Sequence, residues 1–284
     1  MEELLRIVFK TKPFRWTSVS GGDICQAALV ETIEQKFFAK YHQGVFALDM
    51  LEKERVGLEA LLQACPDSTP TVIGLFNSEN LGALLLMDYL EPIPPNHDHF
   101  LNLAERLACV HRKSANQFGF QDVNYIGSLP QSNAWHNRFV DFFIGERLYP
   151  QIQQACEQGR LSEEYIHLVE MNGSVLNSLI PVEVPSMVHG DLWNGNVIYS
   201  KHGKAYFIDP SVHFSHREVD IAMMKLFGGF HPRVIEYYDD QYPLSAGWQE
   251  RLEIYQLYYL LVHLNLFGNS YAQPVQRILN RYFR

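Results

Sequence analysis

The chain has 284 residues, of which 47% are hydrophobic and 13% aromatic, so it can bury a large core as one large domain or as two lobes. Its 23 basic and 32 acidic residues give a net charge of −9, which argues against a nucleic-acid partner and favours a protein that handles small ligands. No apolar run approaches the length of a membrane span, and the acidic N-terminus lacks the pattern of a signal peptide. The sequence therefore predicts a cytoplasmic protein with no membrane partner.

The four cysteines stand about forty residues apart, without a Cys-x-x-Cys pair: Cys25, Cys65, Cys109 and Cys156. This spacing predicts reduced thiols of a cytosolic protein, and it argues against a disulfide framework or a zinc site.

The first predicted element is a hairpin over residues 15–30, with Gly21 and Gly22 at its turn. Glycines let the backbone approach a phosphate and point N–H groups at it, although two glycines between strands are also typical of an ordinary hairpin. The next strand, residues 34–41, carries Lys40 near its end, where the α- and β-phosphates of a nucleotide would meet a cation. The alternative for Lys40 is a solvated lysine at a strand end.

An amphipathic helix is expected over residues 46–63, ending before Pro66. Its acidic residues, Glu52 and Glu54 among them, could be solvated, or one could hold the ammonium of Lys40 in place. Glu54 is the expected partner because it lies four and eight residues before two leucines and so faces near the packed stripe, whereas Glu52 points away.

Two further strands are expected over residues 71–76 and 83–90, and the second runs into the Pro-rich segment 91–95. This break is the best domain boundary in the sequence. It predicts a nucleotide-binding N-lobe over residues 1–90, with an antiparallel sheet and one helix, and a mainly helical C-lobe over residues 91–284.

The strand that crosses into the second lobe exposes backbone N–H and C=O groups, which can read the edge of an adenine. The purine is therefore expected against Asp88, Tyr89 and Leu90.

The rest of the chain is predicted to be mostly helical, over residues 98–115, 133–157, 163–180, 217–227 and 248–266. His111 stands at helical spacing with apolar residues, which is typical of a hydrogen-bonded core histidine. Asp220 either accepts hydrogen bonds from the backbone near residue 189 or is an ordinary acidic residue of a first helical turn.

Two carboxylates each follow a short apolar strand: Asp191 after residues 186–188, and Asp209 after residues 205–208. Asn196 lies five positions after Asp191. Phosphoryl transfer from a nucleotide needs a base for the attacking hydroxyl and oxygen ligands for Mg²⁺.

The spacing matches that of kinases, where His-x-Asp is followed four residues later by Asn and then by a metal-binding Asp. Here Pro210 and Ser211 follow Asp209 in place of Phe-Gly, so the mobile Phe switch of regulated protein kinases is not expected. The alternative is that the two carboxylates only cap turns, in which case the kinase-like spacing of Asp191, Asn196 and Asp209 would be a coincidence. ATP and Mg²⁺ are therefore the predicted cofactors.

The chain resembles the fructosamine kinase family, which is related to aminoglycoside and choline phosphotransferases and has a two-lobed, protein-kinase-like α+β fold. The resemblance covers about residues 18–230 and rests on these segments: residues 21–24, Lys40, residues 107–111, 118–120, 125–127 and 131–133, Trp135, and residues 147–151, 189–196, 208–211 and 217–224.

The resemblance implies ATP-dependent phosphorylation of a ketosamine, an Amadori-type sugar on an amine, at its 3-hydroxyl. Phosphorylation destabilises the adduct and frees the amine, which is a deglycation repair. The substrate would be a small ketosamine or a glycated amine or protein.

The family's site residues carry over onto this chain. Asp191 and His189 are the expected catalytic residues, with Asp191 as the base. Asn196 and Asp209 are expected to bind Mg²⁺.

The family's nucleotide contacts carry over as well. Lys40 and Glu54 would clamp the phosphates, and residues 88–90 would contact adenine. Trp193 stacks on the substrate or belongs to the core. Some relatives carry a cysteine in the Gly loop that supports redox control, whereas here Asp23 follows the glycines and Cys25 stands two places further on.

Two other functions remain open. One is a phosphotransferase for another small hydroxylated amine, such as an aminoglycoside or choline. The other is a nucleotide-binding protein without catalysis, against which the intact set of Lys40, Asp191, Asn196 and Asp209 argues. A protein kinase is disfavoured because no activation-loop segment separates Asp209 from the helix at Arg217.

Overall fold

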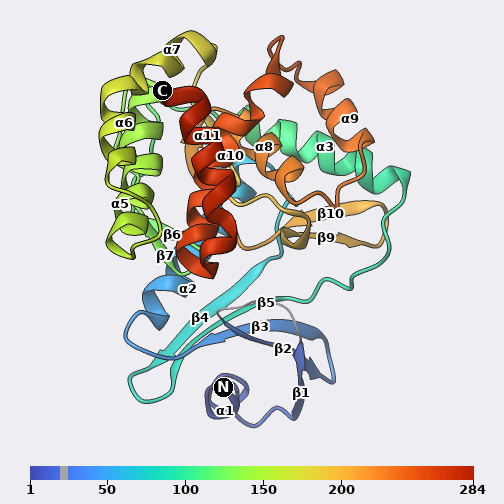
Figure 1. Cartoon of the computed structure of the whole chain (residues 1–284). Helices are drawn as coiled ribbons and strands as arrows, with labels where there is room; N and C mark the ends of the chain where they lie inside the picture. The colour runs from blue at the N-terminus through green and yellow to red at the C-terminus, as the bar shows by residue number, and fades with distance from the viewer. Residues whose placement is uncertain (20–24) are drawn as a thin grey trace. The chain divides into compact units, whose positions relative to one another are not determined.

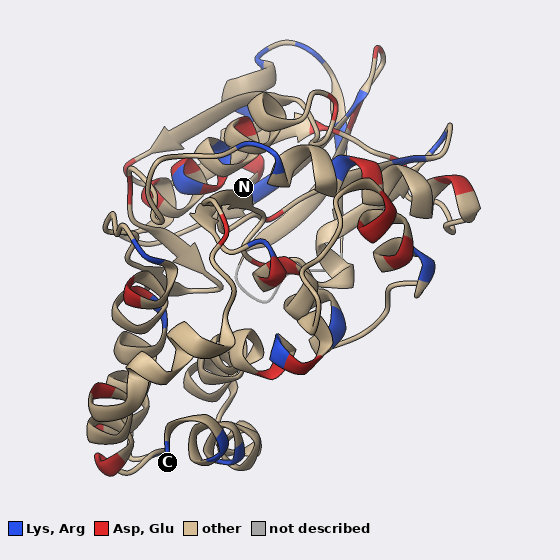
Figure 2. Cartoon of the chain, turned by 90° about the horizontal axis from the view of Figure 1, so that it is seen from above, with Lys and Arg blue, Asp and Glu red and all other residues tan. Residues whose placement is uncertain are grey.

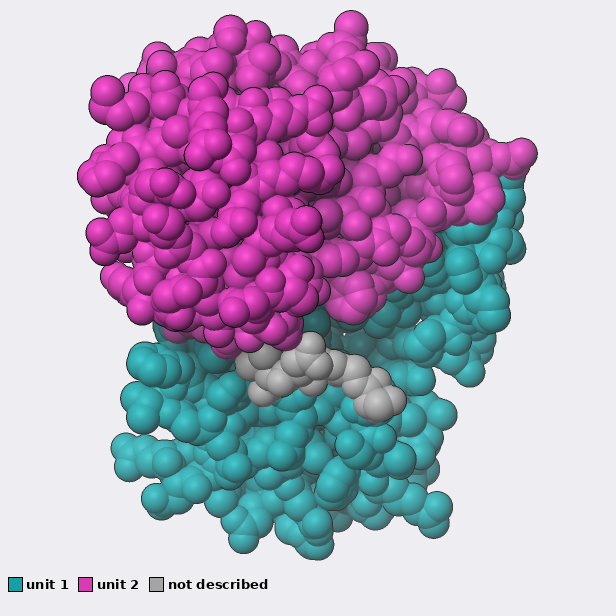
Figure 3. Space-filling model, viewed as in Figure 1, with its two compact units in different colours: residues 1–103, 196–210 teal, residues 104–195, 211–284 magenta. Residues whose placement is uncertain are grey.

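The structure is a computed structural model that describes residues 1–19 and 25–284. Gly21 and Gly22 lie outside the described residues. The chain forms two compact units, coloured in Figure 3: unit 1 is residues 1–103 and 196–210, and unit 2 is residues 104–195 and 211–284. Lys40, Glu54, Asn196 and Asp209 therefore belong to unit 1, and Asp191 belongs to unit 2.

Unit 1 is built on a five-stranded antiparallel sheet with the strand order β1-β2-β3-β5-β4 (Figure 1). The strands are β1 (Phe14–Val19), β2 (Gln26–Thr32), β3 (Lys36–His42), β4 (Val72–Ser78) and β5 (Gly82–Asp88). Two helices accompany them, α1 (Glu2–Phe9) and α2 (Ala47–Ala64).

The two faces of this sheet are covered by different helices because side chains alternate along each strand. Leu84 and Leu86 of β5 pack with Leu5 of α1 on one face. Leu85 packs with Leu58 of α2 on the other face. The central strands are thereby buried on both sides, which fixes the register that places Lys40 opposite Leu85.

Unit 1 also contains a small hairpin, β9 (Val197–Ser200) and β10 (Lys204–Phe207). Phe207 N–H donates to Ser68 O at 2.8 Å, and Ile93 N–H donates to Tyr199 O at 2.9 Å. These bonds tie the hairpin to the loop after α2 and to the Pro-rich segment. Asn196 precedes the hairpin and Asp209 follows it, so the hairpin sets the separation of these two residues.

Unit 2 is mainly helical. Its helices are the second half of α3 (His97–His111), α4 (Phe139–Phe142), the π-helix η1 (Phe143–Leu148), α5 (Tyr149–Glu157), α6 (Glu164–Asn172), η2 (Gly173–Val175), α7 (Leu176–Leu179), α8 (Glu218–Leu226), α9 (Arg233–Gln241), α10 (Trp248–Phe267), η4 (Asn269–Tyr271) and α11 (Ala272–Phe283). The 3₁₀ turn η3 (Asn194–Asn196) ends at the first residue of the segment in unit 1. Its strands are the hairpin β6 (Asn124–Ile126) and β7 (Leu129–Gln131), and the pair β8 (Ser186–Val188) and β11 (His213–Ser215).

The core of unit 2 surrounds α10, which is buried on nearly all sides (Figure 1). Tyr255, Leu257 and Leu261 of α10 are fully buried, and Ala222 of α8 packs in the same cluster. A helix that is apolar all round requires neighbours all round. α10 therefore fixes α8, and α8 in turn carries Asp220.

Several predicted bounds are wrong. α3 ends at His111, four residues earlier than expected, and Ser114 pairs with Ser186 instead. The helix expected from residue 133 begins at Phe139, because the preceding segment pairs in extended form with Phe118. The helix expected over residues 163–180 is divided into α6, η2 and α7.

Acidic and basic residues are interspersed on the helices (Figure 2). On α2, for example, Arg55 donates to Glu52 and to Glu59. Among the described residues, no helix is both long and apolar enough to cross a bilayer.

Candidate active site

The first group of candidate residues lies at the boundary between the sheet of unit 1 and α2. Lys40 on β3 is nearly buried, and its Nζ donates to Glu54 Oε1 on α2 at 2.8 Å. The same Nζ donates to Asp209 Oδ1. The pairing of Lys40 with Glu54 expected from helical spacing is therefore present, and Asp209 joins it.

This arrangement keeps Lys40 charged. Burial by itself lowers the pKa of Lys40, but the carboxylates of Asp209 and Glu54 raise it well above its usual range. Burial also raises the pKa of Glu54, in opposition to the attraction of Lys40. The two carboxylates therefore hold the ammonium of Lys40 charged and in a fixed place.

Asp209 has an unusual backbone. Its φ is +55°, in the left-handed region that non-glycine residues rarely adopt, and it precedes Pro210, where an extended conformation is usual. Strained φ values of this kind cluster at functional sites. Ile208 N–H donates to Asn196 O at 3.0 Å, so the residue before Asp209 is bonded to the other candidate metal ligand.

The donor set of this turn suits a hard divalent cation. Asn196 supplies an amide oxygen and Asp209 a carboxylate, and Mg²⁺ prefers oxygen ligands of this kind. Both residues lie in unit 1 at the two ends of one hairpin.

Cys25 stands beside the same group. Burial raises the pKa of its thiol to about 11, and the cation of Lys40 only partly opposes this. The thiol is therefore protonated at neutral pH and is a weak nucleophile.

The segment expected to contact adenine has two of its N–H groups occupied. Asp88 N–H donates to Thr71 O at 2.9 Å, and Tyr89 N–H donates to Lys36 O at 3.4 Å. These two N–H groups are therefore not available to a purine.

The second group of candidate residues is the loop after β8 in unit 2, which includes His189 and Asp191. His189 N–H and Gly190 N–H donate to the two carboxylate oxygens of Asp220 at 2.7 and 2.9 Å. The predicted bracing of this loop by Asp220 is confirmed. Gly190 has φ +83°, and a Cβ there would lie 2.1 Å from Ser211 O, so only glycine fits this position.

His111 supports Asp220 from behind, as expected of a core histidine. It is 1% exposed, its Nε2 lies 3.1 Å from Asp220 Oδ2, and its Nδ1 lies 2.7 Å from Tyr238 Oη. Arg217 Nη1 also donates to Tyr238 Oη at 3.1 Å. The loop after β8 is therefore supported by a series of buried hydrogen bonds that extends to α9.

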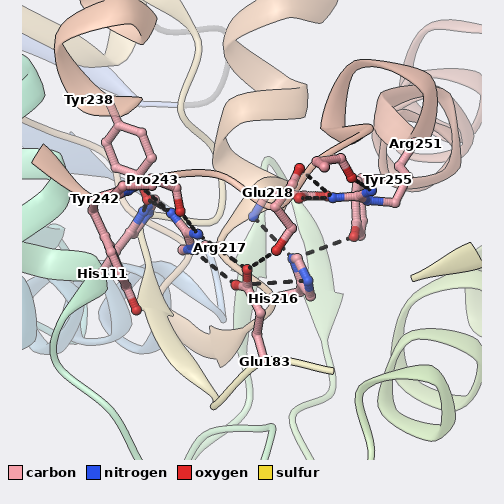
Figure 4. Close-up of polar contacts among 12 residues, drawn as sticks. His111, Glu183, His216, Arg217, Glu218, Tyr238, Tyr242, Pro243, Arg251 and Tyr255 are labelled. Carbon is pink, nitrogen blue, oxygen red and sulfur yellow. Dashed lines mark hydrogen bonds and ion pairs between the residues drawn. The ribbon is translucent and has the colours of Figure 1, made fainter. Parts of the chain in front are cut away.

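This series of hydrogen bonds continues through Arg217 into a cluster of side chains that has the composition of a metal site (Figure 4). The ligand atoms of Glu183, His216 and Glu218 lie within 4.8 Å of one another. Both carboxylates are already paired, however, because Arg217 Nε donates to Glu183 at 3.0 Å and Arg251 Nε donates to Glu218 at 2.9 Å. Two arginines would repel a cation.

The tautomer of His216 leads to the same conclusion. Its Nδ1 accepts the N–H of Glu218 at 3.3 Å, so the ring proton lies on Nε2, which stands 3.8 Å from Glu183 Oε2 without a hydrogen-bond partner and, carrying the proton, is not a metal ligand. Burial lowers the pKa of His216. The cluster is best understood as a structural ion-pair network.

Trp193 lies two residues beyond Asp191 and is 44% exposed. Its ring covers Gly195, where a Cβ would lie 2.2 Å from Trp193 Cη2. Exposure of nearly half the indole argues against a core role and leaves a face open to a ligand.

The sequence model of the family described as fructosamine kinase matches residues 6–284. The chain belongs to this family. It is 39% identical to a candidate ketoamine kinase of Enterococcus faecium, over 93% of the chain and 94% of that protein. It is 30% identical to the ketosamine-3-kinase of Mus musculus, over 95% of the chain and 96% of that protein.

Among solved structures, the candidate fructosamine-3-kinase of Thermobifida fusca superposes with a TM-score of 0.88 at 30% identity, covering 99% of this chain and 98% of that chain. The expected kinase-like α+β fold and the family resemblance are both confirmed.

A buried network of polar side chains in unit 2 lies in segments that resemble the fructosamine kinase family. The sequence analysis did not predict its role. Asn124 Nδ2 donates to Val212 O at 2.9 Å, and Gln131 Nε2 donates to Asn124 Oδ1 at 2.8 Å. Arg147, fully buried, donates to Asn133 Oδ1 at 2.5 Å. This network fixes the start of the segment after Pro210, and the only signal for it in the sequence was the family resemblance of residues 131–133 and 147–151.

Proposed function

We propose that this chain is an ATP-dependent kinase that phosphorylates the 3-hydroxyl of ketosamines, a deglycation activity. The observation that carries the proposal is the group formed by Lys40, Glu54 and Asp209. It is accompanied by the loop that contains Asp191, which is held in place because the N–H groups of the two preceding residues donate to Asp220. Family membership over residues 6–284 and the names of the relatives support the substrate class.

The nucleotide half of the proposed site belongs to the predicted N-lobe, residues 1–90, and to the β9–β10 hairpin. Lys40, held by Glu54, would bind phosphate oxygens, and the segment from Asp88 through Tyr89 to Leu90 would bind adenine. Gly21 and Gly22 are proposed to cover the phosphates. Asn196 and Asp209 would hold Mg²⁺, which when bound neutralises charge on the phosphate oxygens.

The acceptor half belongs to the predicted C-lobe, residues 91–284. Asp191 would accept the proton of the sugar hydroxyl and orient its oxygen for in-line attack. His189 and Gly190 contribute through their backbone, since Asp220 fixes both amides. Most of the rate enhancement would come from positioning and electrostatics, because phosphoryl transfer needs little covalent chemistry from the protein.

The test combines a substrate panel with one substitution. ADP release is measured with a ketosamine, with kanamycin and with choline, and we expect turnover with the ketosamine. Asp191→Asn should lower kcat by about 10³-fold, as expected for loss of a general base, while ATP binding measured by calorimetry stays within twofold. If the wild type phosphorylated kanamycin or choline but not the ketosamine, the assignment of the substrate would be wrong. An unchanged kcat in the variant would show that Asp191 is not the base.

A further inference from the structure

An aromatic stripe runs along α10, away from the catalytic loop. Tyr259, His263 and Phe267 are four residues apart, so they lie on one face of the helix. At a rise of about 1.5 Å per residue, the stripe extends about 12 Å. It begins at the catalytic loop, because Tyr259 Oη donates to Gly190 O at 2.9 Å.

The inner and outer ends of the stripe differ in exposure. Tyr259 is 1% exposed and belongs to the core, whereas Phe267 is 55% exposed. His263 connects the two ends, since its Nδ1 donates to Tyr259 O at 2.8 Å and its ring lies 5.3 Å from that of Phe267. The stripe therefore leaves the core and reaches the surface of unit 2.

Two further rings complete this outer end. The ring of His263 lies 4.6 Å from that of Phe227 and 5.2 Å from that of Tyr271. Phe227 is 43% exposed. We call Phe227, His263, Phe267 and Tyr271 the aromatic patch. Exposed apolar groups gathered in this way are typical of ligand-binding surfaces.

The aromatic patch is linked to the catalytic loop a second time. Phe227 lies two residues before Gly229, where a Cβ would stand 2.8 Å from Asn194 Cβ. Asn194 follows Trp193, whose indole is partly exposed on the same loop. The patch thus adjoins, within unit 2, a segment that packs against the loop bearing Asp191.

We propose that the aromatic patch is a subsite for the substituent on the amine nitrogen of the ketosamine, and that it favours apolar or aromatic substituents. The proposal rests on the proposed kinase function. Because Gly229, next to the patch, packs against Asn194 of the loop that carries Asp191, a substituent that projects from a sugar bound at this loop would meet the ring faces of the patch.

The chemistry of the patch fits this ligand. Ring faces attract both hydrocarbon and the ammonium group of a protonated amine. His263 does not oppose the cation, because burial lowers its pKa and the ring is neutral at pH 7.

The experiment compares two ketosamines that differ only in the substituent, the fructosyl adducts of benzylamine and of methylamine. KM is measured for both with wild type, Phe227→Ala and Phe267→Ala. We expect each variant to raise KM for the benzylamine adduct about fivefold, the effect of losing one aromatic contact, and to leave KM for the methylamine adduct and for ATP within twofold. Met171→Ala, at a residue 80% exposed on α6, is the matched control and should change neither.

Three results would overturn the subsite. In the first, the ratio of the two KM values is the same in wild type and both variants while both adducts are phosphorylated, so the kinase function stands and the subsite falls. In the second, wild type phosphorylates neither adduct, and both proposals fall. In the third, sedimentation shows that Phe267→Ala converts a wild-type dimer to a monomer, so the patch is a contact between copies of the chain.

Discussion

At the scale of single residues, the site depends on a carboxylate whose oxygens already accept hydrogen bonds from the backbone. Both carboxylate oxygens of Asp220 accept hydrogen bonds from the amides of His189 and Gly190, and the residue is fully buried. Hydrogen bonds to a charged acceptor contribute about 1.5–3 kcal/mol each. Asp220 is thus a positioning residue that acts on the reaction through the loop.

We predict that Asp220→Asn lowers both stability and rate. The amide of Asn can accept one of the two N–H groups but presents a donor to the other, so the free energy of unfolding should fall by about 2–3 kcal/mol and kcat at least tenfold. KM for ATP should change little, since Asp220 belongs to the acceptor half of the site. Urea unfolding and steady-state kinetics measure these effects.

The matched control is Asp141→Asn, which removes a half-exposed carboxylate paired with Arg138. Exposed pairs contribute about 0–1 kcal/mol, so this variant should behave like wild type. Equal losses in the two variants would show that burial of Asp220 is irrelevant to the loop.

How much of the site follows from sequence depends on the kind of interaction. Helical periodicity was enough to predict Glu54, and not Glu52, as the partner of Lys40, because the position of a residue along a helix determines the direction of its side chain. The left-handed φ of Asp209 was not predictable, since no local preference favours it before proline. The aromatic patch combines residues from three elements, so no periodic pattern contains it.

At the scale of elements, α2 positions the Lys40 group through a close contact. A Cβ at Gly57 would lie 2.9 Å from Pro210 Cγ, and Gly57 is one turn beyond Glu54. Glycine within a helix normally costs about 1 kcal/mol relative to alanine. Here it lets α2 approach the turn that holds Asp209.

We predict that Gly57→Ala does not give the usual gain in helix stability. The added methyl group must displace Pro210 or α2, so KM for ATP should rise several-fold and the free energy of unfolding should fall by about 1–3 kcal/mol, as in overpacked cores. Gly145→Ala is the control, because its Cβ would meet only His136 Cε1 at 3.8 Å. A gain in stability in both variants would contradict the positioning role of Gly57.

Two of the helices that the sequence analysis missed, α9 and α11, have a common cause, whereas α1, a second helix where one was expected, contains no proline. α11 carries Pro274 in its first turn, and α9 begins directly after Pro232. Proline normally marks a break, yet it is tolerated where the first N–H groups of a helix have no partner. By contrast, β5 and α2 were found because their apolar periodicity matches the two faces that they bury.

At the scale of the whole molecule, buried titratable groups link folding to pH. Burial lowers the pKa of His216 and His263, and lowers that of His213 well below its ordinary value of 6.5. Below pH 6.5 the unfolded chain takes up protons at these sites that the folded chain does not. Their contribution to stability is therefore present above pH 6.5 and is lost as the pH falls.

Glu54 acts in the opposite direction, because burial raises its pKa above the ordinary value of 4.5. The three histidines outnumber Glu54, so the free energy of unfolding should fall as the pH drops below 6.5, by up to about 1.4 kcal/mol per pH unit for each proton that only the unfolded chain binds.

His216→Phe tests this account, because it removes one titrating ring from between Phe139 and Tyr255. The variant should be less stable than wild type at pH 7.5, since Glu218 N–H loses its acceptor. Its loss of stability between pH 6.5 and 5 should nevertheless be shallower, by at most about 1.4 kcal/mol per pH unit. Urea unfolding across this pH range measures the slope for both proteins. Parallel curves would mean that His216 is protonated in the folded protein, held by Glu183 at 3.8 Å, and that burial does not govern its charge.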